Sequence, residues 1–272
     1  NFYMIKNIIH IGSNRAASTS LQKNLFNKLK HFFHIGLNSK LDFKQKENFR
    51  KLISSRTQYN FQNSLVKKIN ELKIKKKKII ISSEDICSSS AIDLCSARLS
   101  KILPNADILI IIRNQFDALN SWFNFTGHLF KFGPKQVYKK KILFDDWLKY
   151  IYDFRDYNIS PYQLSPIASM NYSEIISIFS KNFTNSKVHI LLYEDLLFNK
   201  EIPILKLAKI LNIKEDQIIK NFIKSKKLNF SNNHNNIFKK KYRDYLFEYF
   251  AKSNKLLEKK YKIDLKKYNY PI

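Results

Sequence analysis

Residues 7–22, NIIHIGSNRAASTSLQ, decide the fold of this chain. Residues 7–11 form an apolar run without alternation, which is typical of a strand covered on both faces of a parallel sheet. Residues 19–30 then place Leu21, Leu25 and Leu29 on one face of a helix. A buried strand that leads through a short loop into an amphipathic helix predicts an α/β fold.

Three further apolar runs, at residues 78–82, 107–113 and 187–193, indicate more strands of the same kind. A second amphipathic helix is expected after the third run, where Phe116, Leu119 and Phe123 share a face. We therefore expect a doubly wound, mainly parallel sheet of about four to five strands flanked by helices, with the ligand site beyond the carboxyl ends of the strands.

The composition predicts one globular domain over residues 1–272. Hydrophobic residues make up 44% of the chain, while Gly and Pro number only 4 and 6, which argues against disorder and linker-rich architectures. Residues 130–180, with Trp147, Pro161 and Pro166, are interpreted as an insertion that shapes an acceptor cleft. A helical segment is expected over residues 238–262, and residues 229–236 could be a linker or a ligand loop.

The cysteine content and the lengths of the apolar runs indicate which cellular compartment to expect for this protein. Cys87 and Cys95 cannot form a disulfide framework and show no zinc-ligand spacing, so a reducing, cytoplasmic location is expected. No apolar run approaches the ~20 residues of a membrane span. The chain begins with Asn1, so the sequence leaves open whether an anchor has been removed.

The loop after the first strand has the layout of an anion-binding loop. Backbone N–H groups at a helix start are unpaired and attract phosphate or sulfate, and Arg15 adds a permanent charge. The candidate binding residues are Gly12, Ser13, Asn14, Arg15, Ala16, Ala17, Ser18 and Thr19. An alternative is that Thr19 and Gln22 form an ordinary capping box.

The position of the cation in this loop favours a phosphosulfate over a triphosphate. A nucleoside-triphosphate loop places Lys directly after its second Gly, where it reaches the distal phosphates. Ser18 occupies that position here, and the cation lies earlier, at Arg15. A 5′-phosphate that carries one further anion fits this arrangement better.

The end of the third strand offers a second anion site. Arg113 closes the strand in IIRNQFDALNSW, and Ser121 follows eight residues later. Together they could hold a second phosphate, because ligands bind at the carboxyl ends of parallel strands. The alternative is that Arg113 pairs with Asp117 and that Ser121 is polar surface.

These motifs resemble those of the sulfotransferases that use 3′-phosphoadenosine 5′-phosphosulfate. GSNRAASTSLQ resembles their 5′-phosphosulfate loop and IIRNQFDALNSW their 3′-phosphate element. LLYEDLL and the ending NKLLEKKYKIDLKKYNYP are similar to bacterial members that act on carbohydrates. The chain departs from the family pattern at Arg15 for Lys, Ala17 for Gly and Gln115 for Pro.

The resemblance implies metal-free transfer of a sulfuryl group to a hydroxyl of a saccharide or glycoconjugate. By this resemblance, Arg15 would stabilise the departing phosphate oxygen during the transfer. Glu84 would be the catalytic base, as in heparan-type members. The alternative for Glu84 is a first-turn acid in a short helix capped by Ser82 or Ser83. His128 is the rival base, because cytosolic members use a histidine.

Two other functions are compatible with the sequence. A kinase with a phosphate loop would use Glu84, Asp85 or Asp195 as metal ligands, but it requires the missing loop lysine. A non-enzymatic polyanion binder rests only on the net charge of +27, from 49 Lys plus Arg against 22 Asp plus Glu. No nucleic-acid recognition module is found. Glu194 and Asp195 are expected to be first-turn acids or a structural clasp, and the oligomeric state is not predicted.

Overall fold

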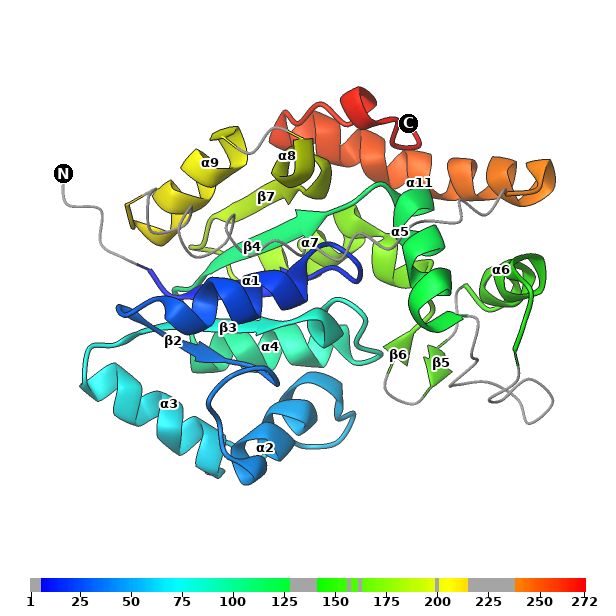
Figure 1. The fold of residues 1–272 in the computed structure, drawn as a ribbon. Helices are drawn as coiled ribbons and strands as arrows, with labels where there is room; N and C mark the ends of the chain where they lie inside the picture. The colour runs from blue at the N-terminus through cyan, green and yellow to red at the C-terminus, as the bar shows by residue number, and fades with distance from the viewer. Residues whose placement is uncertain (1–5, 128–140, 156–157, 161–162, 199–200, 215–237) are drawn as a thin grey trace.

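Five parallel strands form the central sheet of the computed structural model, in the order β2-β3-β1-β4-β7 (Figure 1). The structure describes residues 6–127, 141–155, 158–160, 163–198, 201–214 and 238–272. The strands are β1 (Ile8–Gly12), β2 (Phe32–Ile35), β3 (Lys78–Ser83), β4 (Asp107–Ile112) and β7 (Val188–Leu192). The doubly wound α/β fold predicted from the sequence is confirmed.

The sheet contains one strand more than the four apolar runs predicted. β2 has only four residues, FFHI, and His34 interrupts its apolar character. The helix predicted over residues 19–30 is also shorter: α1 (Ser18–Asn24) is followed by the 3-10 helix η1 (Phe26–Lys28). The helix ends early because the chain must turn to reach β2. The spacing of the leucines does not predict this turn.

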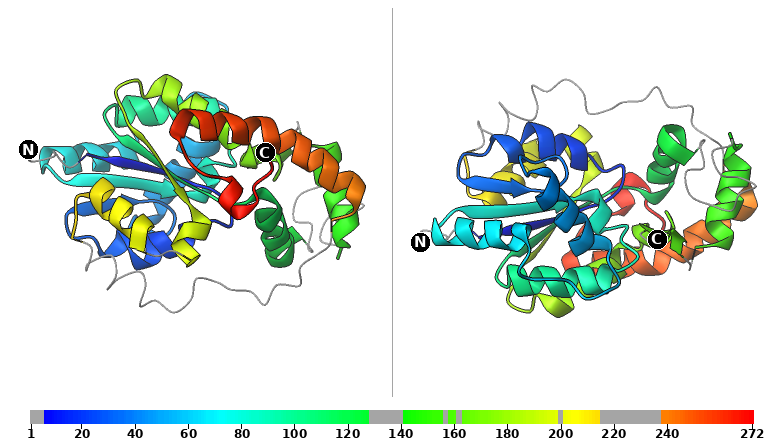
Figure 2. Two further views of the ribbon diagram at one scale, coloured as in Figure 1. Left: turned by 90° about the horizontal axis from the view of Figure 1, so that it is seen from above. Right: turned by 90° about the horizontal axis from the view of Figure 1, so that it is seen from below.

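Helices cover both faces of the sheet because its strands carry apolar side chains in both directions. Ile8, Leu109 and Leu191 face α1, η1, α8 (Tyr193–Phe198) and α9 (Glu201–Leu211). Ile9 and Ile110 face the opposite layer, which includes α4 (Ile92–Ile102), α7 (Tyr172–Asn182) and α11 (Lys240–Tyr261). Seen from above, α1 and α9 lie on one side of the sheet and α7 and α11 on the other (Figure 2).

Two helices, α2 (Phe43–Ser54) and α3 (Ser64–Ile74), extend the layer that contains α4. Each begins at a residue that satisfies free backbone N–H groups. Asp42 and Gln45 form a capping box at α2, and the Asn63 side chain accepts from two backbone N–H groups of α3.

Parallel pairing brings the carboxyl ends of β1, β3 and β4 to one edge. Ile11 pairs with Ser83, and Gly12 pairs with Ile111. Three segments begin there: the loop that precedes α1, the 3-10 helix η2 (Glu84–Ile86), and α5 (Gln115–Trp122) with the π-helix η3 (Phe123–Gly127). This edge therefore unites the segments that the sequence singled out for chemistry.

The segment interpreted as an acceptor-cleft insertion is only partly separate from the sheet. It contains α6 (Phe144–Asp153), the hairpin of β5 (Asn158–Ser160) and β6 (Gln163–Leu164), and the 3-10 helix η4 (Ala168–Met170). Its last part is α7, which buries four side chains in the main core and leads into β7. His128 and residues 229–236 lie outside the described residues.

The C-terminal segment predicted to be helical coincides with α11, and the 3-10 helix η6 (Lys266–Tyr268) follows it. Cys87 and Cys95 are buried free thiols. Within the part of the chain that the structure describes, no helix is both long enough and apolar enough to cross a bilayer.

Candidate active site

The loop between β1 and α1 contains two residues in the left-handed backbone region. Arg15 has φ 63° and Ala17 has φ 61°, although neither is glycine. Ala17 is the N-cap of α1 and makes no side-chain cap hydrogen bond. The alternative that the sequence offered for this loop, a Thr19–Gln22 capping box, is wrong: the N-cap is Ala17, and the Gln22 side chain donates to Ser82 Oγ over 3.1 Å. The first turn of α1 thus has no side-chain cap.

Gly12 lies close to the residue that follows β3. A Cβ atom at Gly12 would lie 2.7 Å from Ser18 Oγ and 2.9 Å from the Cα and N atoms of Glu84. Only glycine therefore allows the loop and Glu84 to lie so close together.

The candidate loop residues divide into an inner and an outer group. Ser13 and Ala16 are buried, and the buried Asn14 Nδ2 has no hydrogen-bond partner among the described residues. Ser18 Oγ donates to the Ser13 carbonyl over 3.2 Å, which holds the turn closed. The partly exposed Arg15, Ala17 and Thr19, together with the buried Ser18, line a cavity of about 60 Å³.

This cavity brings together side chains from separate segments of the chain. Besides the loop, it is lined by Glu84 after β3, by Arg113 and Ser121 at β4 and α5, and by Ser20 and Tyr193. Neither Ser20 nor Tyr193 is among the site residues predicted from the sequence. Tyr193 directly follows β7, so the rule that ligands bind at the carboxyl ends of parallel strands could have found it.

Arg15 connects the two predicted anion sites. Its Nε atom donates to Ser121 Oγ over 3.0 Å, and its guanidinium lies 4.3 Å from the centre of the Phe125 ring. Burial lowers the pKa of Arg15, and the nearby charge of Arg113 lowers it further, while Glu84 opposes this. Two guanidinium groups beside one small cavity favour an anionic ligand there.

Arg113 is held in place by its surroundings rather than by an acid. Its guanidinium lies 4.6 Å from the centre of the Tyr193 ring, and its buried Nε has no hydrogen-bond partner among the described residues. The alternative predicted from sequence is wrong: no ion pair joins Arg113 to Asp117 in the described chain, and Ser121 is only 6% exposed. Arg113 lines the cavity and forms no ion pair within the described chain, so its positive charge remains for an anionic ligand.

Tyr172 ties the two anion-binding segments together. Its hydroxyl donates to the Arg113 carbonyl over 2.9 Å, and it lies 3.3 Å from Ser13 Oγ, which donates to it. The side chain is fully buried, and burial raises the pKa of the Tyr172 hydroxyl well above its ordinary value. The sequence gives no sign of this role, because Tyr172 begins a helix 59 residues beyond Arg113.

Glu84 shows both features that the sequence left as alternatives. It begins the 3-10 helix η2, where Ser83 Oγ accepts from the Asp85 backbone N–H over 3.2 Å. It also lines the cavity, and its carboxylate makes no hydrogen bond or ion pair with a described residue. Burial raises the pKa of Glu84, Asp85 raises it further, and Arg15 opposes the shift.

Glu194 forms the structural clasp that the sequence suggested. One carboxylate oxygen accepts from the Asn114 backbone N–H over 2.8 Å and the other from the Tyr270 hydroxyl over 2.9 Å. Asn114 in turn donates to the carbonyls of Tyr268 and Asn269. The C-terminal segment therefore fixes the turn that follows Arg113.

Asp195 is also engaged in this clasp. It accepts from Lys267 Nζ over 3.1 Å and from the Tyr268 hydroxyl over 2.7 Å. Among the described residues, no group of three or more His, Cys, Asp or Glu side chains has a metal-binding arrangement.

Comparison with known proteins relates this fold to solved sulfotransferase structures. No protein-family model and no curated protein sequence matches the chain. The crystal structure of a sulfotransferase from Alicyclobacillus acidocaldarius is similar with a TM-score of 0.59 at 14% identity, covering 97% of this chain and 99% of that one. Mouse sulfotransferase SULT7A1 complexed with PAP is similar with a TM-score of 0.51 at 14% identity, covering 94% and 90%.

These similarities extend over nearly the whole chain, so they concern the complete arrangement of strands and helices. The chain has the α/β fold of these two sulfotransferase structures.

Proposed function

We propose that this protein is a sulfotransferase that moves a sulfuryl group from 3′-phosphoadenosine 5′-phosphosulfate to a hydroxyl of an acceptor. One observation carries the proposal: Arg15, Glu84, Arg113 and Ser121, chosen from the sequence as separate strand-end features, line a single cavity. The fold similarity to two sulfotransferases supports the same function, and the neighbour complexed with PAP supports the same nucleotide.

The donor would be held by two groups of residues. In this proposal, Arg113 and Ser121 bind the 3′-phosphate, and Arg15 with the uncapped first turn of α1 binds the 5′-phosphosulfate. The charges of Arg15 and Arg113, which both line the cavity, suit such a doubly anionic ligand.

The transfer needs a base, and Glu84 is placed to act as one. The acceptor oxygen attacks sulfur as its proton passes to the Glu84 carboxylate, and the bond from sulfur to the bridging phosphate oxygen breaks. Arg15 stabilises the negative charge on the departing oxygen. The raised pKa of Glu84 brings this carboxylate nearer to the range of an effective base. The two arginines supply the positive charge, so the proposal includes no metal.

A saccharide or glycoconjugate is the acceptor that we infer. Phe125 is 63% exposed and lies against Arg15, so its ring offers an apolar surface beside the reacting groups. The net charge of +27 favours an acidic saccharide chain among such acceptors. The buried thiols of Cys87 and Cys95 fit the expected reducing, cytoplasmic compartment.

Binding of adenosine 3′,5′-bisphosphate is the first test of this function. A nucleotide at 100 times its Kd should stabilise the wild-type protein by about 2.7 kcal/mol. Arg113→Ala should remove most of the resulting rise in melting temperature, whereas Arg56→Ala, at an exposed arginine, should retain it. No rise with the wild type would contradict the proposal, and a rise seen only with Mg²⁺ and ATP would favour a kinase.

Transfer itself is measured with donor that carries radioactive sulfur. Unsulfated and sulfated oligosaccharides and a simple phenol are offered as acceptors, and we expect label on a saccharide. Label on the phenol alone would retain the sulfotransferase and overturn the acceptor class. Nucleotide binding without transfer to any acceptor would overturn the enzymatic proposal.

A further inference from the structure

The outer edge of β7 lies in a groove away from the candidate active site. β7 is the last strand of the sheet, and two cavities of about 540 and 220 Å³ follow it. Together these cavities are lined by every residue from Val188 to Leu192. Their walls come from α9 and from the C-terminal end of α11, and Figure 2 shows this edge of the sheet between the two helices.

Among the described residues, none forms a backbone hydrogen bond with the outer edge of β7, which therefore offers free backbone groups to the groove. The Lys187 carbonyl accepts from the Ile108 N–H over 2.8 Å, so residue 187 points its backbone groups toward β4. Successive residues of a strand alternate in this direction, and therefore Val188 and Ile190 point their N–H and C=O groups into the groove. Such an edge is a template for a further strand.

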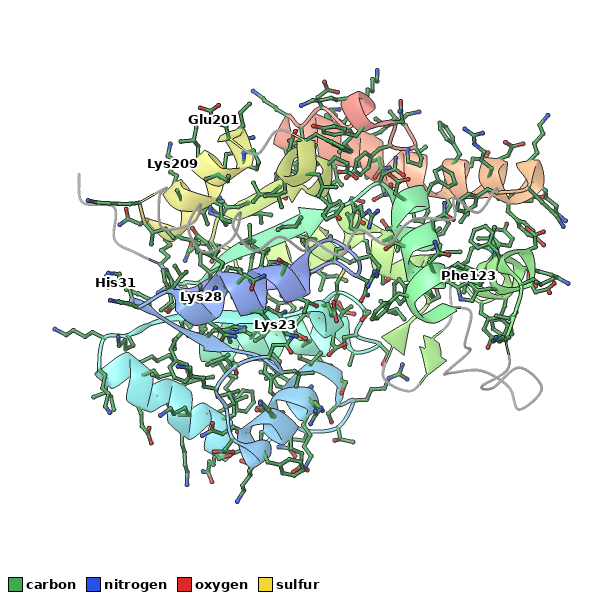
Figure 3. The ribbon with its side chains drawn as sticks, in the orientation of Figure 1. Lys23, Lys28, His31, Phe123, Glu201 and Lys209 are labelled. Atoms are coloured by element: carbon green, nitrogen blue, oxygen red, sulfur yellow. The ribbon has the colours of Figure 1, made fainter. Side chains whose placement is uncertain are left out.

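The walls of the groove carry positive charge that nearby acids do not neutralise. Lys187, Lys206, Lys209 and Lys262 line the cavities and form no ion pair with a described residue. Lys209 lies on α9 (Figure 3). Four unpaired lysines around one groove favour a ligand of opposite charge.

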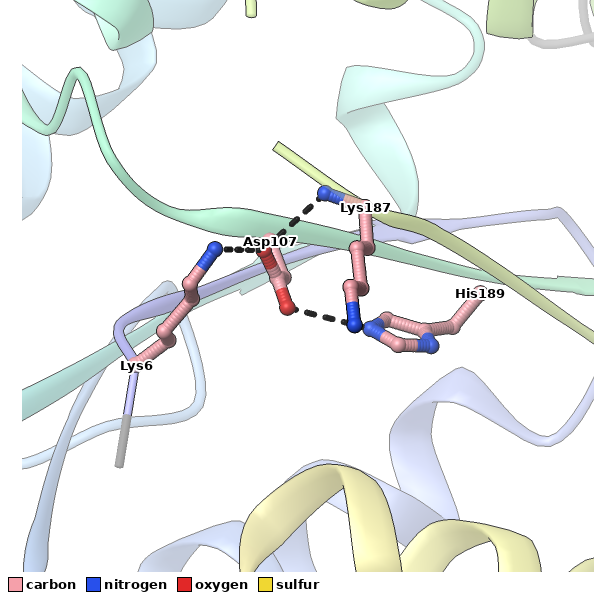
Figure 4. A network of polar contacts seen from close by, with 4 residues as sticks. All are labelled: Lys6, Asp107, Lys187 and His189. Atoms are coloured by element: carbon pink, nitrogen blue, oxygen red, sulfur yellow. Dashed lines mark hydrogen bonds and ion pairs between the residues drawn. The ribbon is translucent and has the colours of Figure 1, made fainter. Parts of the chain in front are cut away.

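The acids of the groove are already engaged. Asp107 accepts from Lys6 Nζ and from the Lys187 backbone N–H, both over 3.0 Å, and lies 3.2 Å from His189 Nε2 (Figure 4). Asp195 pairs with Lys267 as described above, and Asp264 accepts from the Lys267 backbone N–H. Six lysines and three aspartates line the two cavities, so the groove keeps a net positive charge.

The lysines are arranged for binding more than for protection of the edge. A lysine on an edge strand can prevent unwanted strand pairing. Only Lys187 directly precedes β7, whereas Lys206 and Lys209 come from α9 and Lys262 follows α11. Charges placed on both walls leave the backbone edge itself uncovered by lysines along Val188, His189 and Ile190, the partly exposed residues of β7.

We propose that this groove binds an acidic, extended peptide segment of another protein, which adds to β7 as a sixth strand. The free backbone groups specify an extended chain, and the lysines specify acidic side chains. A small anion would use the lysines but not the strand edge. A second copy of this chain would place the same lysines against one another, which is unfavourable.

The test uses an acetylated, fluorescently labelled peptide of alternating Glu and Val residues. We expect it to bind the full chain, and to slow hydrogen exchange at the Val188 and Ile190 amides. A control peptide has the same sequence, but every second backbone amide is N-methylated. It should not bind, because it has no N–H groups to donate along the edge that would face β7. Lys206→Glu should weaken binding by about tenfold, which is 1.4 kcal/mol. Lys67→Glu, at an exposed lysine of α3, is the matched control and should have no effect.

Several results would overturn the proposal. Absence of peptide binding would do so, as would equal binding of the N-methylated peptide, because the strand edge would then play no part. Tripolyphosphate is added as a competitor at a concentration that supplies about as many negative charges as the peptide. If it displaces the peptide fully, the groove is a general anion site. A dimer, measured by sedimentation, that Lys206→Glu alters would identify a second copy of the chain as the occupant.

Discussion

The guanidinium of Arg113 donates a hydrogen bond to the backbone carbonyl of Arg15 over 2.9 Å. The two residues are 98 positions apart in sequence, and they meet because β1 and β4 are neighbouring parallel strands. One cation thus supports the loop that contains the other. In the proposed function this contact links the residues that bind the two anionic ends of one nucleotide.

Tyr172→Phe tests the buried link between these two segments. The variant loses the hydroxyl that donates to Arg113 and accepts from Ser13, and it leaves both without this partner. We expect a loss of about 1–3 kcal/mol in the free energy of unfolding, measured with urea. Nucleotide affinity should fall as well. Tyr245→Phe, at a tyrosine that is 43% exposed, should change neither quantity.

Glu84→Gln tests the proposed base. The amide cannot accept a proton, so sulfuryl transfer should fall by ~10²–10⁴-fold while nucleotide binding is retained. Asp85→Asn is the neighbouring control, because Asp85 does not line the cavity and should keep most of the activity. Undiminished turnover in Glu84→Gln would assign the proton to another group, with His128 the next candidate.

The pH dependence of sulfuryl transfer provides a second test of Glu84 as the general base. A general base works in its deprotonated form, and burial raises the pKa of Glu84 above its ordinary value of 4.5. Activity should therefore be full above this raised pKa and decline as the pH falls through it. The residual activity of Glu84→Gln should lack this decline, and a profile identical to that of the wild type would contradict the assignment.

Ala17→Gly tests the strained loop. Ala17 has φ 61°, and an alanine in the left-handed region costs about 1–2 kcal/mol, whereas glycine does not. The greater freedom of glycine in the unfolded chain offsets about 0.5–1 kcal/mol of this gain. We expect a modest rise in the free energy of unfolding. Ala16→Gly, at the buried neighbour without positive φ, should lower it.

The buried histidines predict a loss of stability in acid. Burial, with a contribution from His34, lowers the pKa of His10 from 6.5 to about 3, and burial lowers that of His34 to about 4. The unfolded chain therefore binds protons more readily, so stability is full above pH 6.5 and declines as the pH falls toward these values.

Urea unfolding between pH 7 and about pH 4 measures this effect. Each buried histidine should add up to ~1.4 kcal/mol per pH unit to the slope of stability against pH. His10→Gln should reduce the slope even if it lowers stability at pH 7. His31→Gln, at an exposed histidine, should leave the slope as it is in the wild type. An unchanged slope in His10→Gln would contradict this origin.

The amino-acid sequence determined those features that depend on neighbouring residues or on strand order. Apolar runs specified β1, β3, β4 and β7, since a strand buried on both faces must be apolar throughout. The rule that parallel strands end at one edge then placed Arg15, Glu84 and Arg113 near one another. The sequence did not predict the short β2, because four residues that include a histidine do not show the continuous apolar pattern of a buried strand.

Only the tertiary structure decided which side chains meet across that edge. Gln22 has the spacing of a capping box, but it bonds to Ser82 because β3 lies beside α1. Tyr172 reaches Ser13 and Arg113, and Tyr193 supports Arg113, through packing of segments far apart in the chain. Local sequence fixes backbone preference and burial, whereas such contacts arise only when the sheet brings distant segments together.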